Sequence, residues 1–315
     1  MNTHHRLPRY LARVYQTLLL IAAVLAPGLS LAQESPVIKI NAEAEKAEIK
    51  VTPLRGNVYL LEGSGGNIGA LAGQDTKFLV DAGISVSKDK LSRALQGLGP
   101  GRISHVVNTH WHWDHADGNP WLPGKNVVVV AHPNTARYLA QTERVDDWNY
   151  TFKPLAASGQ PKDLVDHHKS YKLGGEGIEV VALPPSHTDG DLYIYFKKAD
   201  VLFLGDTFWN GVYPFIDNEH GGSIDGMIRA VDVGLKVAGP NTIIVPGHGP
   251  AGNKQDLVAF RSMLQTIRDN VSALKASGNS EKDAIAAKPT AAYDAKWGNF
   301  VINPDFFVHL VYSGL

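Results

Sequence analysis

Residues 108–118 read Asn-Thr-His-Trp-His-Trp-Asp-His-Ala-Asp-Gly, directly after the apolar stretch Ile103–Val107. Within six positions this run holds four potential metal ligands, namely His110, His112, Asp114 and His115. Imidazole nitrogens and carboxylate oxygens both suit zinc or iron. Side chains two positions apart share one face of a strand, so His110 and His112 would point the same way, whereas the other two ligands require a turn. The spacing therefore predicts two groups of ligands for two ions.

Three further candidate ligands occur later in the chain, each after an apolar run that predicts a buried strand. They are His187 after Ile178–Leu183, Asp206 after Val201–Leu204 and His248 after Ile243–Val245. Each lies where a strand would open into a glycine- or proline-rich loop, a common position for functional side chains in α/β proteins. A single loop histidine is usually only solvated, but the repeated position after strands favours a shared site.

The run from His110 to His115 resembles the His-x-His-x-Asp-His signature of the metallo-β-lactamase superfamily, and the later ligands follow in the superfamily's order. The resemblance covers about residues 55 to 250 and implies an α/β fold, the four-layer αβ/βα sandwich, with the metals at one edge between two sheets. Spacing alone would also permit a doubly wound sheet. By resemblance the ligands are His110, His112 and His187 for the first metal, Asp114, His115 and His248 for the second, and Asp206 as a bridge.

The bridging position distinguishes branches of this superfamily. Many of its β-lactamases lack a bridging carboxylate, and one large subclass has cysteine there, whereas Asp206 resembles glyoxalase II, the lactonases and related hydrolases. Glyoxalase II also has a basic helical region near its C-terminus, which has no evident counterpart here. The resemblance implies a zinc-dependent hydrolase that cleaves an ester, lactone or β-lactam-like amide by metal-bound hydroxide. We expect two Zn²⁺ as cofactors, with iron or manganese as alternatives.

Three residues are predicted to act in catalysis. Asp114 could orient the hydroxide and pass its proton to the leaving group, and Asp206 would keep the two metals close. Tyr213 is a candidate hydrogen-bond donor to the oxyanion. The remaining polar candidates would support the ligands rather than bind metal: Asp81, Thr109 and Thr207 as hydrogen-bond partners, Ser186 through its backbone, and His220 in an outer loop.

The loop after Asp206 predicts an uncharged, aromatic pocket rim. It contains no lysine or arginine before Arg229, and it offers Phe208, Trp209, Tyr213 and Phe215 instead. Tryptophans 111, 113, 121 and 148 could add to the rim, although Trp111 and Trp113 could equally be packing residues. We therefore expect neutral apolar substrates to be preferred over carboxylate-bearing β-lactams, unless Arg144 or Lys153 reaches the pocket.

Alternative functions remain open at this stage. One is a true metallo-β-lactamase that hydrolyses β-lactam antibiotics. Another is a mononuclear or dinuclear iron redox or sulfur enzyme on the same fold, although flavodiiron proteins usually have glutamate at the position of His112. A third is a non-catalytic metal-binding protein.

The N-terminus predicts export. Three arginines precede the apolar segment Thr17–Ala26, and Ser30-Leu31-Ala32 provides small residues for cleavage, so residues 1–32 are predicted to be a signal peptide. The chain has no cysteine, which suits an oxidising compartment such as a bacterial periplasm. An uncleaved anchor is the alternative. The mature chain would carry a net charge of about −4, which argues against a nucleic-acid partner. We expect a small-molecule acyl substrate and no stable membrane association after cleavage.

After the leader, residues 33–50 are predicted as a flexible lead-in with a short strand at Val37–Ile40, and residues 51–315 as a single hydrolase domain. Capping residues and apolar periodicity predict helices over Lys88–Leu98, Ile224–Val237 and Gln255–Ala276. Residues 144–168 are irregular in pattern and could form a lid.

Overall fold

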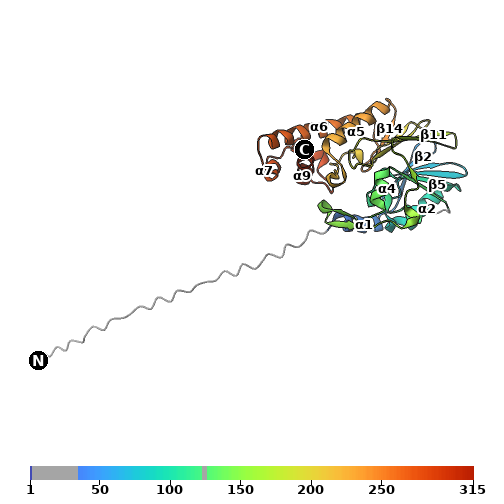
Figure 1. The fold of residues 1–315 in the computed structure, drawn as a ribbon, viewed down its shortest axis with the longest axis horizontal. Helices are drawn as coiled ribbons and strands as arrows, with labels where there is room; N and C mark the ends of the chain where they lie inside the picture. Colours follow the sequence, from blue (N-terminus) through green and yellow to red (C-terminus); the bar gives the residue numbers. More distant parts are fainter. Residues whose placement is uncertain (2–34, 123–125) are drawn as a thin grey trace. The chain divides into compact units, whose positions relative to one another are not determined.

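The computed structural model describes Met1, residues 35–122 and residues 126–315. Apart from Met1, the predicted signal peptide lies outside these described residues. None of the helices in the described ranges is long and apolar enough to cross a membrane. The residues from Ser35 onwards belong to one compact unit, which contains all the elements described below (Figure 1).

The first sheet has seven strands in the order β1-β2-β3-β4-β5-β6-β9. Strands β1 to β4 pair antiparallel, whereas β4, β5, β6 and β9 pair parallel. The strands are β1 (Lys50–Arg55), β2 (Val58–Glu62), β3 (Ile68–Ala72), β4 (Thr76–Val80), β5 (Arg102–Val107), β6 (Val128–Ala131) and β9 (Asp163–Leu164).

The second sheet has five strands in the order β10-β11-β12-β13-β14, of which only the last pair is parallel. They are β10 (His168–Leu173), β11 (Glu176–Ala182), β12 (Leu192–Phe196), β13 (Val201–Phe203) and β14 (Ile243–Val245). A separate hairpin joins β7 (Glu143–Val145) to β8 (Tyr150–Phe152), within the segment that the sequence suggests as a lid.

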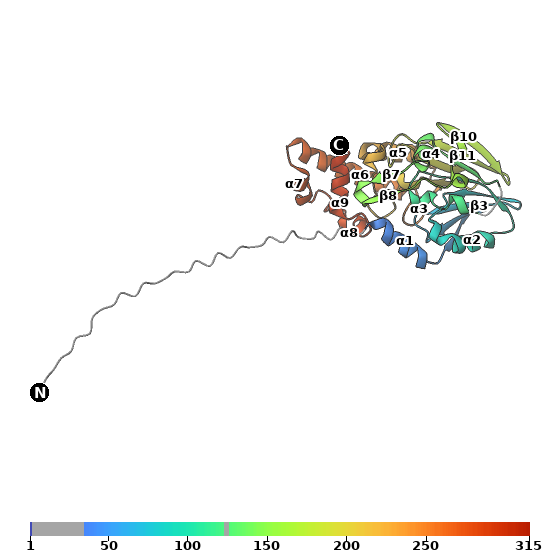
Figure 2. The same ribbon diagram turned by 60° about the horizontal axis from the view of Figure 1, so that its bottom comes forward.

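Helices cover the outer faces of both sheets (Figure 2). The α-helices are α1 (Pro36–Lys46), α2 (Lys88–Gly97), α3 (Trp113–Ala116), α4 (Pro133–Leu139), α5 (Ile224–Val237), α6 (Lys254–Ala276), α7 (Glu281–Ala286), α8 (Asp294–Trp297) and α9 (Pro304–Ser313). Short 3₁₀ turns are η1 (Ser85–Ser87), η2 (Asn119–Trp121), η3 (Asp146–Trp148), η4 (Ala157–Gly159), η5 (Gly205–Thr207) and η6 (Asn218–His220). The predicted helices over α2, α5 and α6 are confirmed to within one residue.

Alternation along the strands explains the layers. In β5, Val106 packs with Leu91 and Leu95 of α2, whereas its neighbour Val107 faces the second sheet. In the second sheet Phe203 faces the first sheet, while Leu202 packs with α5 and α6. The order is therefore helix, sheet, sheet, helix, which confirms the predicted αβ/βα sandwich.

The prediction of a strand at Val37–Ile40 is wrong, because this part of the predicted lead-in belongs to helix α1. Pro36 occupies the first turn, where its missing N–H costs nothing, and the Ser35 hydroxyl accepts a hydrogen bond from the Val37 N–H at 3.3 Å. Val37 and Ala44 bury one face of the helix. The sequence signal for a cap was present, but the short apolar run concealed it.

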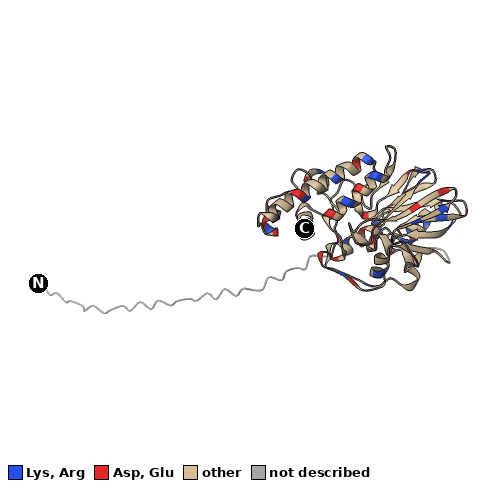
Figure 3. Ribbon diagram, turned by 45° about the horizontal axis from the view of Figure 1, so that its top comes forward, with Lys and Arg blue, Asp and Glu red and all other residues tan. Residues whose placement is uncertain are grey.

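Positions of basic and acidic residues are mixed along the outer helices and strands (Figure 3). Along α6, Arg261 pairs with Asp232 of α5 and Arg268 pairs with Asp225. The whole chain is close to neutral, with 30 basic and 31 acidic residues, so its charge gives no preference for a polyanion.

Candidate metal centre

The seven predicted ligands come together at the carboxyl ends of β5, β11, β13 and β14. They form two groups, His110 with His112, His187 and Asp206, and Asp114 with His115 and His248, and the ligand atoms within each group lie within 4.8 Å of one another. Asp206 joins the groups, because its Oδ1 is 3.1 Å from His115 Nε2 and its Oδ2 is 3.5 Å from His187 Nε2. The two predicted ligand sets thus correspond to two groups of side chains in the structure, and Asp206 lies close to both.

The predicted turn inside the motif is present. Strand β5 ends at Val107, and helix α3 begins at Trp113 with His112 at its N-cap position. His110 and His112 therefore lie before the helix, whereas Asp114 and His115 lie in its first turn. The change from extended to helical backbone directs the two pairs into different ligand groups.

Each histidine of the first group is held by the ring nitrogen that faces away from the centre. His187 Nδ1 donates to the carbonyl oxygen of Phe215 at 2.9 Å, and His110 Nδ1 donates to the Thr109 hydroxyl at 3.0 Å. His112 instead uses Nε2, which donates to Asp217 Oδ2 at 2.9 Å, and its Nδ1 lies 3.0 Å from His110 Nε2. The remaining nitrogens converge on one point, the arrangement that orients imidazoles towards a metal.

Asp81 performs the supporting role that the sequence predicts. Its carboxylate accepts hydrogen bonds from the Thr109 N–H at 2.7 Å, the Thr109 hydroxyl at 2.8 Å and His115 Nδ1 at 2.8 Å. Its backbone is left-handed, with φ of 65°, and this turns the side chain back under the motif. Thr207 does not support a ligand, because its hydroxyl donates to the carbonyl oxygen of Leu204. Ser186 donates to Asp191, which also holds the His187 backbone.

The electrostatics of the site favour positive charge. Burial lowers the pKa of His248, but the Asp206 and Asp114 carboxylates outweigh burial and raise that pKa to about 9. Burial acts in the same way on His115, whose pKa the three nearby carboxylates hold well above its ordinary value. Burial lowers the pKa of His112 to about 4, which keeps this imidazole neutral at pH 7. A cation bound here would replace the protons on His115 and His248.

Two buried atoms support the fit of divalent metal ions. Asp206 Oδ1 and His115 Nε2 are buried and lie 3.1 Å apart without the geometry of a hydrogen bond, and neither has another partner, which is costly unless a further group satisfies them. The surrounding backbone makes room at two glycines: a Cβ at Gly247 would lie 1.8 Å from Asp206 Oδ1, and one at Gly66 would lie 2.2 Å from His115 Cε1. Five imidazoles and two carboxylates form a donor set that suits zinc.

Asp217 is a functional residue that the sequence reasoning missed. It connects His112 to His220, whose Nδ1 donates to Asp217 Oδ1 at 2.8 Å, and His220 Nε2 lies 3.3 Å from Glu143 Oε2. His220 therefore contacts Asp217, which supports the ligand His112, and it belongs to neither ligand group. Asp217 belongs to a Phe-Ile-Asp-Asn-Glu-His run in which an aspartate precedes a histidine by three positions, and this was the available signal.

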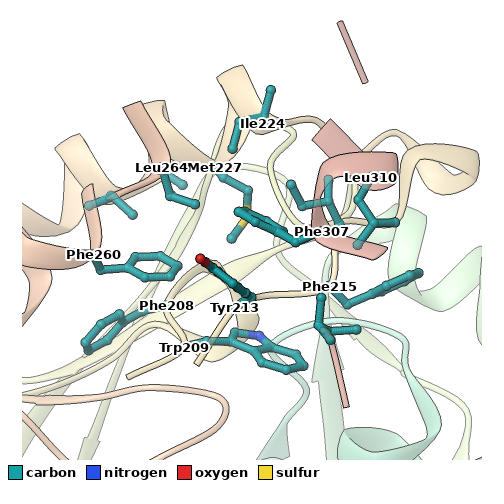
Figure 4. Packing of buried hydrophobic residues seen from close by; sticks show 14 of the residues in the cluster. Phe208, Trp209, Tyr213, Phe215, Ile224, Met227, Phe260, Leu264, Phe307 and Leu310 are labelled. Carbon is teal, nitrogen blue, oxygen red and sulfur yellow. The ribbon is translucent and has the colours of Figure 1, made fainter. Parts of the chain in front are cut away.

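The predicted role of Tyr213 as an oxyanion donor is corrected by the structure. Its side chain is fully buried among Phe260, Met227 and Phe307, with the Phe307 ring stacked at 4.6 Å (Figure 4). Its hydroxyl donates to Asp294 Oδ1 at 2.9 Å, and burial raises its pKa far above the ordinary value. Tyr213 is also absent from the residues that line the cavity at the ligands. It is a core residue.

A cavity of about 210 Å³ opens beside the ligands, and His112, Asp114, Asp206 and His248 form its floor. The predicted aromatic rim is correct in part. Trp113, Trp148, Trp209 and Phe215 line the cavity. Phe208 instead packs in the core against Phe260, and Trp111 is buried beside His220. The cavity also has an outer wall that the sequence did not predict, from helix α1 and residues 300–306.

Comparison with known proteins gives a family match. A family model described as the metallo-beta-lactamase superfamily matches residues 51–248. A protein named probable metallo-hydrolase from Bacillus subtilis is 24% identical over 202 residues, which are 64% of this chain and 88% of that protein. A hydroxyacylglutathione hydrolase from Erythrobacter litoralis is 25% identical over 147 residues, 46% of this chain and 49% of that enzyme.

Solved structures show the same fold. A metallo-beta-lactamase from Pontibacter korlensis superposes with a TM-score of 0.54 at 21% identity, covering 69% of this chain and 99% of that one. A stereoselective inverting sec-alkylsulfatase from Pseudomonas sp. superposes with a TM-score of 0.62 at 16% identity, covering 84% of this chain and 50% of that one. At such identities the similarity concerns the fold alone.

Proposed function

This chain belongs to the metallo-β-lactamase superfamily and is a metal-dependent hydrolase, and on that premise we propose that it hydrolyses acyl bonds with two zinc ions bound. The observation that carries the proposal is the position of Asp206. Its Oδ1 lies 3.1 Å from His115 Nε2 in one ligand group, and its Oδ2 lies 3.5 Å from His187 Nε2 in the other. A carboxylate that reaches both groups suits a pair of ions rather than a single ion.

When bound, the two ions would acidify water and polarise the carbonyl oxygen of the substrate. The protein's own residues fix the geometry of that chemistry. Asp81, Asp217, Thr109 and the Phe215 carbonyl hold the ligand rings in place, so the donor atoms need little rearrangement when substrate enters.

Asp114 is positioned to carry a proton. Its Oδ2 lies 3.2 Å from His248 Nε2, and the residue also lines the cavity. In ester hydrolysis the oxygen of water joins the acyl carbon, the bond from that carbon to the alcohol oxygen breaks, and the leaving oxygen takes up a proton. Because Asp114 lines the cavity, its carboxylate could pass this proton to the leaving oxygen.

The test combines metal content with a substrate screen. Elemental analysis of the active protein should give close to two zinc ions per chain, and a strong chelator should abolish turnover, which added zinc restores. Matched esters, lactones, thioesters and β-lactams should reveal at least one acyl substrate. One iron per chain with negligible zinc, or no turnover of any acyl substrate by zinc-loaded protein, would refute the proposal.

Export to the periplasm belongs to the same proposal and rests on the arginine-flanked apolar segment Thr17–Ala26. Mass spectrometry of protein isolated from a bacterial periplasm should give a mature N-terminus near Gln33. Protein that retains residues 1–32 would instead indicate an anchor.

A further inference from the structure

The outer wall of the cavity consists of two segments that lie at opposite ends of the described chain, helix α1 and residues 300–306. In the ribbon, α1 lies near α8 (Figure 2). Helix α1 contributes Ile40 and Ala44, its C-cap contributes Ala47, and residues 300–306 contribute Phe300, Ile302 and Phe306. All six side chains are apolar. Because these side chains and the ligands line one cavity, a substrate whose reacting bond lies at the ligands can pack its remaining atoms against this wall.

The wall is held in place before any substrate enters. Lys90 donates to the carbonyl oxygens of Ala44 at 3.0 Å and Glu45 at 2.7 Å, and it also bonds that of Ala47, which fastens the end of α1. Trp113 donates its indole N–H to Asn41 at 2.9 Å. A preformed apolar surface loses little entropy when a ligand packs on it.

Phe300 is the most exposed part of this wall. Its side chain is 46% exposed, although its ring lies 6.1 Å from the Trp209 ring and 6.2 Å from the ring of His248. Phe300 is thus a large apolar side chain that is open to solvent beside the candidate metal ligand His248. An apolar group of a substrate could cover it.

The described lining of the cavity offers no lysine or arginine that could bind an anionic group of a substrate. The acidic residues of this lining are Glu43, Asp114 and Asp206. Glu43 lies 4.0 Å from Lys39, and both side chains are mostly exposed, so this pair adds little net charge. Arg144, a candidate for reaching the pocket, pairs with Asp146, and neither it nor Lys153 lines the cavity.

We propose that this outer wall binds the acyl chain of a neutral aliphatic ester or lactone, with Ile40 and Phe300 determining which chain lengths are preferred. The inference rests on the proposed acyl hydrolysis and names its substrate class. A cavity of about 210 Å³ accommodates a chain of moderate length rather than a large substrate.

The first experiment measures chain-length dependence with p-nitrophenyl acetate, butyrate, hexanoate and octanoate. For the zinc-loaded protein, kcat/KM should rise roughly fourfold for each methylene that the wall buries. Ile40→Ala and Phe300→Ala should flatten this rise, with a larger loss of kcat/KM for octanoate than for acetate. Ile38→Ala is the matched control, because Ile38 is on the same helix, is 49% exposed and does not line the cavity. A chain-length profile that is flat in the parent protein, or unchanged in both test variants, would overturn the inference.

The second experiment varies charge at constant length. Three p-nitrophenyl esters of six-carbon acids are compared, one neutral, one with a terminal carboxylate and one with a terminal trimethylammonium group. The neutral ester should have the highest kcat/KM, by about tenfold or more over the anion, and Ile40→Arg should narrow that gap while Ile38→Arg does not. A preference for either charged ester in the parent protein contradicts the inference.

A binding measurement separates this inference from the proposed function. Octanamide and acetamide are neutral probes of different chain length, and calorimetry reports their affinity without turnover. If no ester is hydrolysed but octanamide binds more tightly than acetamide and Phe300→Ala removes the difference, the proposed function fails and the apolar site stands. If esters are hydrolysed and the two amides bind alike, the apolar site fails and the hydrolase stands.

Discussion

The floor and the outer wall of the cavity are built on different physical principles. The floor consists of buried polar side chains, and each ligand ring in its first group is fixed by a directional hydrogen bond such as that from His112 Nε2 to Asp217 at 2.9 Å. The outer wall consists of apolar side chains on α1 and residues 300–306, which need only to be packed in position. Reaction chemistry is therefore tied to exact donors and acceptors, whereas selectivity depends on a surface whose composition can vary at lower cost.

The strongest test of this contrast is Asp206→Asn on the floor. The change keeps the size of the side chain but removes the charge that both ligand groups share, so we expect a loss of roughly a thousandfold or more in kcat. Metal content should fall towards one ion per chain, and circular dichroism should show an intact fold. Wild-type turnover with two ions bound would mean that Asp206 does not bridge.

A smaller effect is expected from Asp217→Asn, because this carboxylate acts through His112. Loss of such a partner typically lowers metal affinity or activity by about 10- to 100-fold. Zinc affinity measured by competition with a chelator gives a readout beside activity. Asp232→Asn is the matched control, since Asp232 pairs with Arg261 on the far side of the second sheet. Equal effects in both variants would indicate general destabilisation.

Tyr213→Phe tests whether Tyr213, which the sequence predicts to act in catalysis, contributes to turnover. Removing the hydroxyl leaves Asp294 without its partner, so the free energy of unfolding should fall by about 1–2 kcal/mol. Because the hydroxyl does not reach the ligands, kcat/KM for a good ester should stay within twofold. A hundredfold loss of kcat with normal stability would restore the catalytic assignment.

The smallest effect concerns the fastening of the outer wall. His309 of α9 bonds Asp147 at 3.0 Å and Glu281 at 2.8 Å, and these partners outweigh partial burial and raise its pKa to about 9. A raised pKa in the folded state stabilises the protein fully below the unfolded value of about 6.5, and this stabilisation is lost as the pH rises through about 9.

In the parent protein the free energy of unfolding should fall between about pH 6.5 and 9 as His309 loses its proton. His309→Gln should remove that contribution, which we expect to be about 1 kcal/mol or less because the side chain is partly exposed. Denaturant titrations at several pH values measure this slope. An unchanged slope in the variant would show that the two ion pairs do not stabilise α9.

Several of the seven ligands could be located from the sequence because their positions follow local rules. His110, Asp206 and His248 come within three residues of the end of a strand, and the strands β5, β13 and β14 are evident as apolar runs. The position of His110, His187, Asp206 and His248 after apolar runs favoured a shared site, and the resemblance to the superfamily assigned them to one ligand set. Asp81 could be predicted as a supporting residue because the superfamily commonly has such an Asp-x-Gly turn before its first helix.

Other features were decided only by tertiary structure. Trp209 and Phe208 are adjacent in sequence, yet Trp209 lines the cavity and Phe208 packs on α6, since side-chain direction depends on the backbone after η5. Phe300 and Ile40 lie 260 positions apart and carry no motif, so nothing in their local sequence indicates that they share a wall. The sequence alone thus indicated the metal-ligating chemistry, because strand ends and ligand types are local properties, whereas the choice of the αβ/βα sandwich over a doubly wound sheet came from the resemblance to the superfamily. The shape and polarity of the substrate cavity came from long-range packing, which brings together residues with no pattern in common.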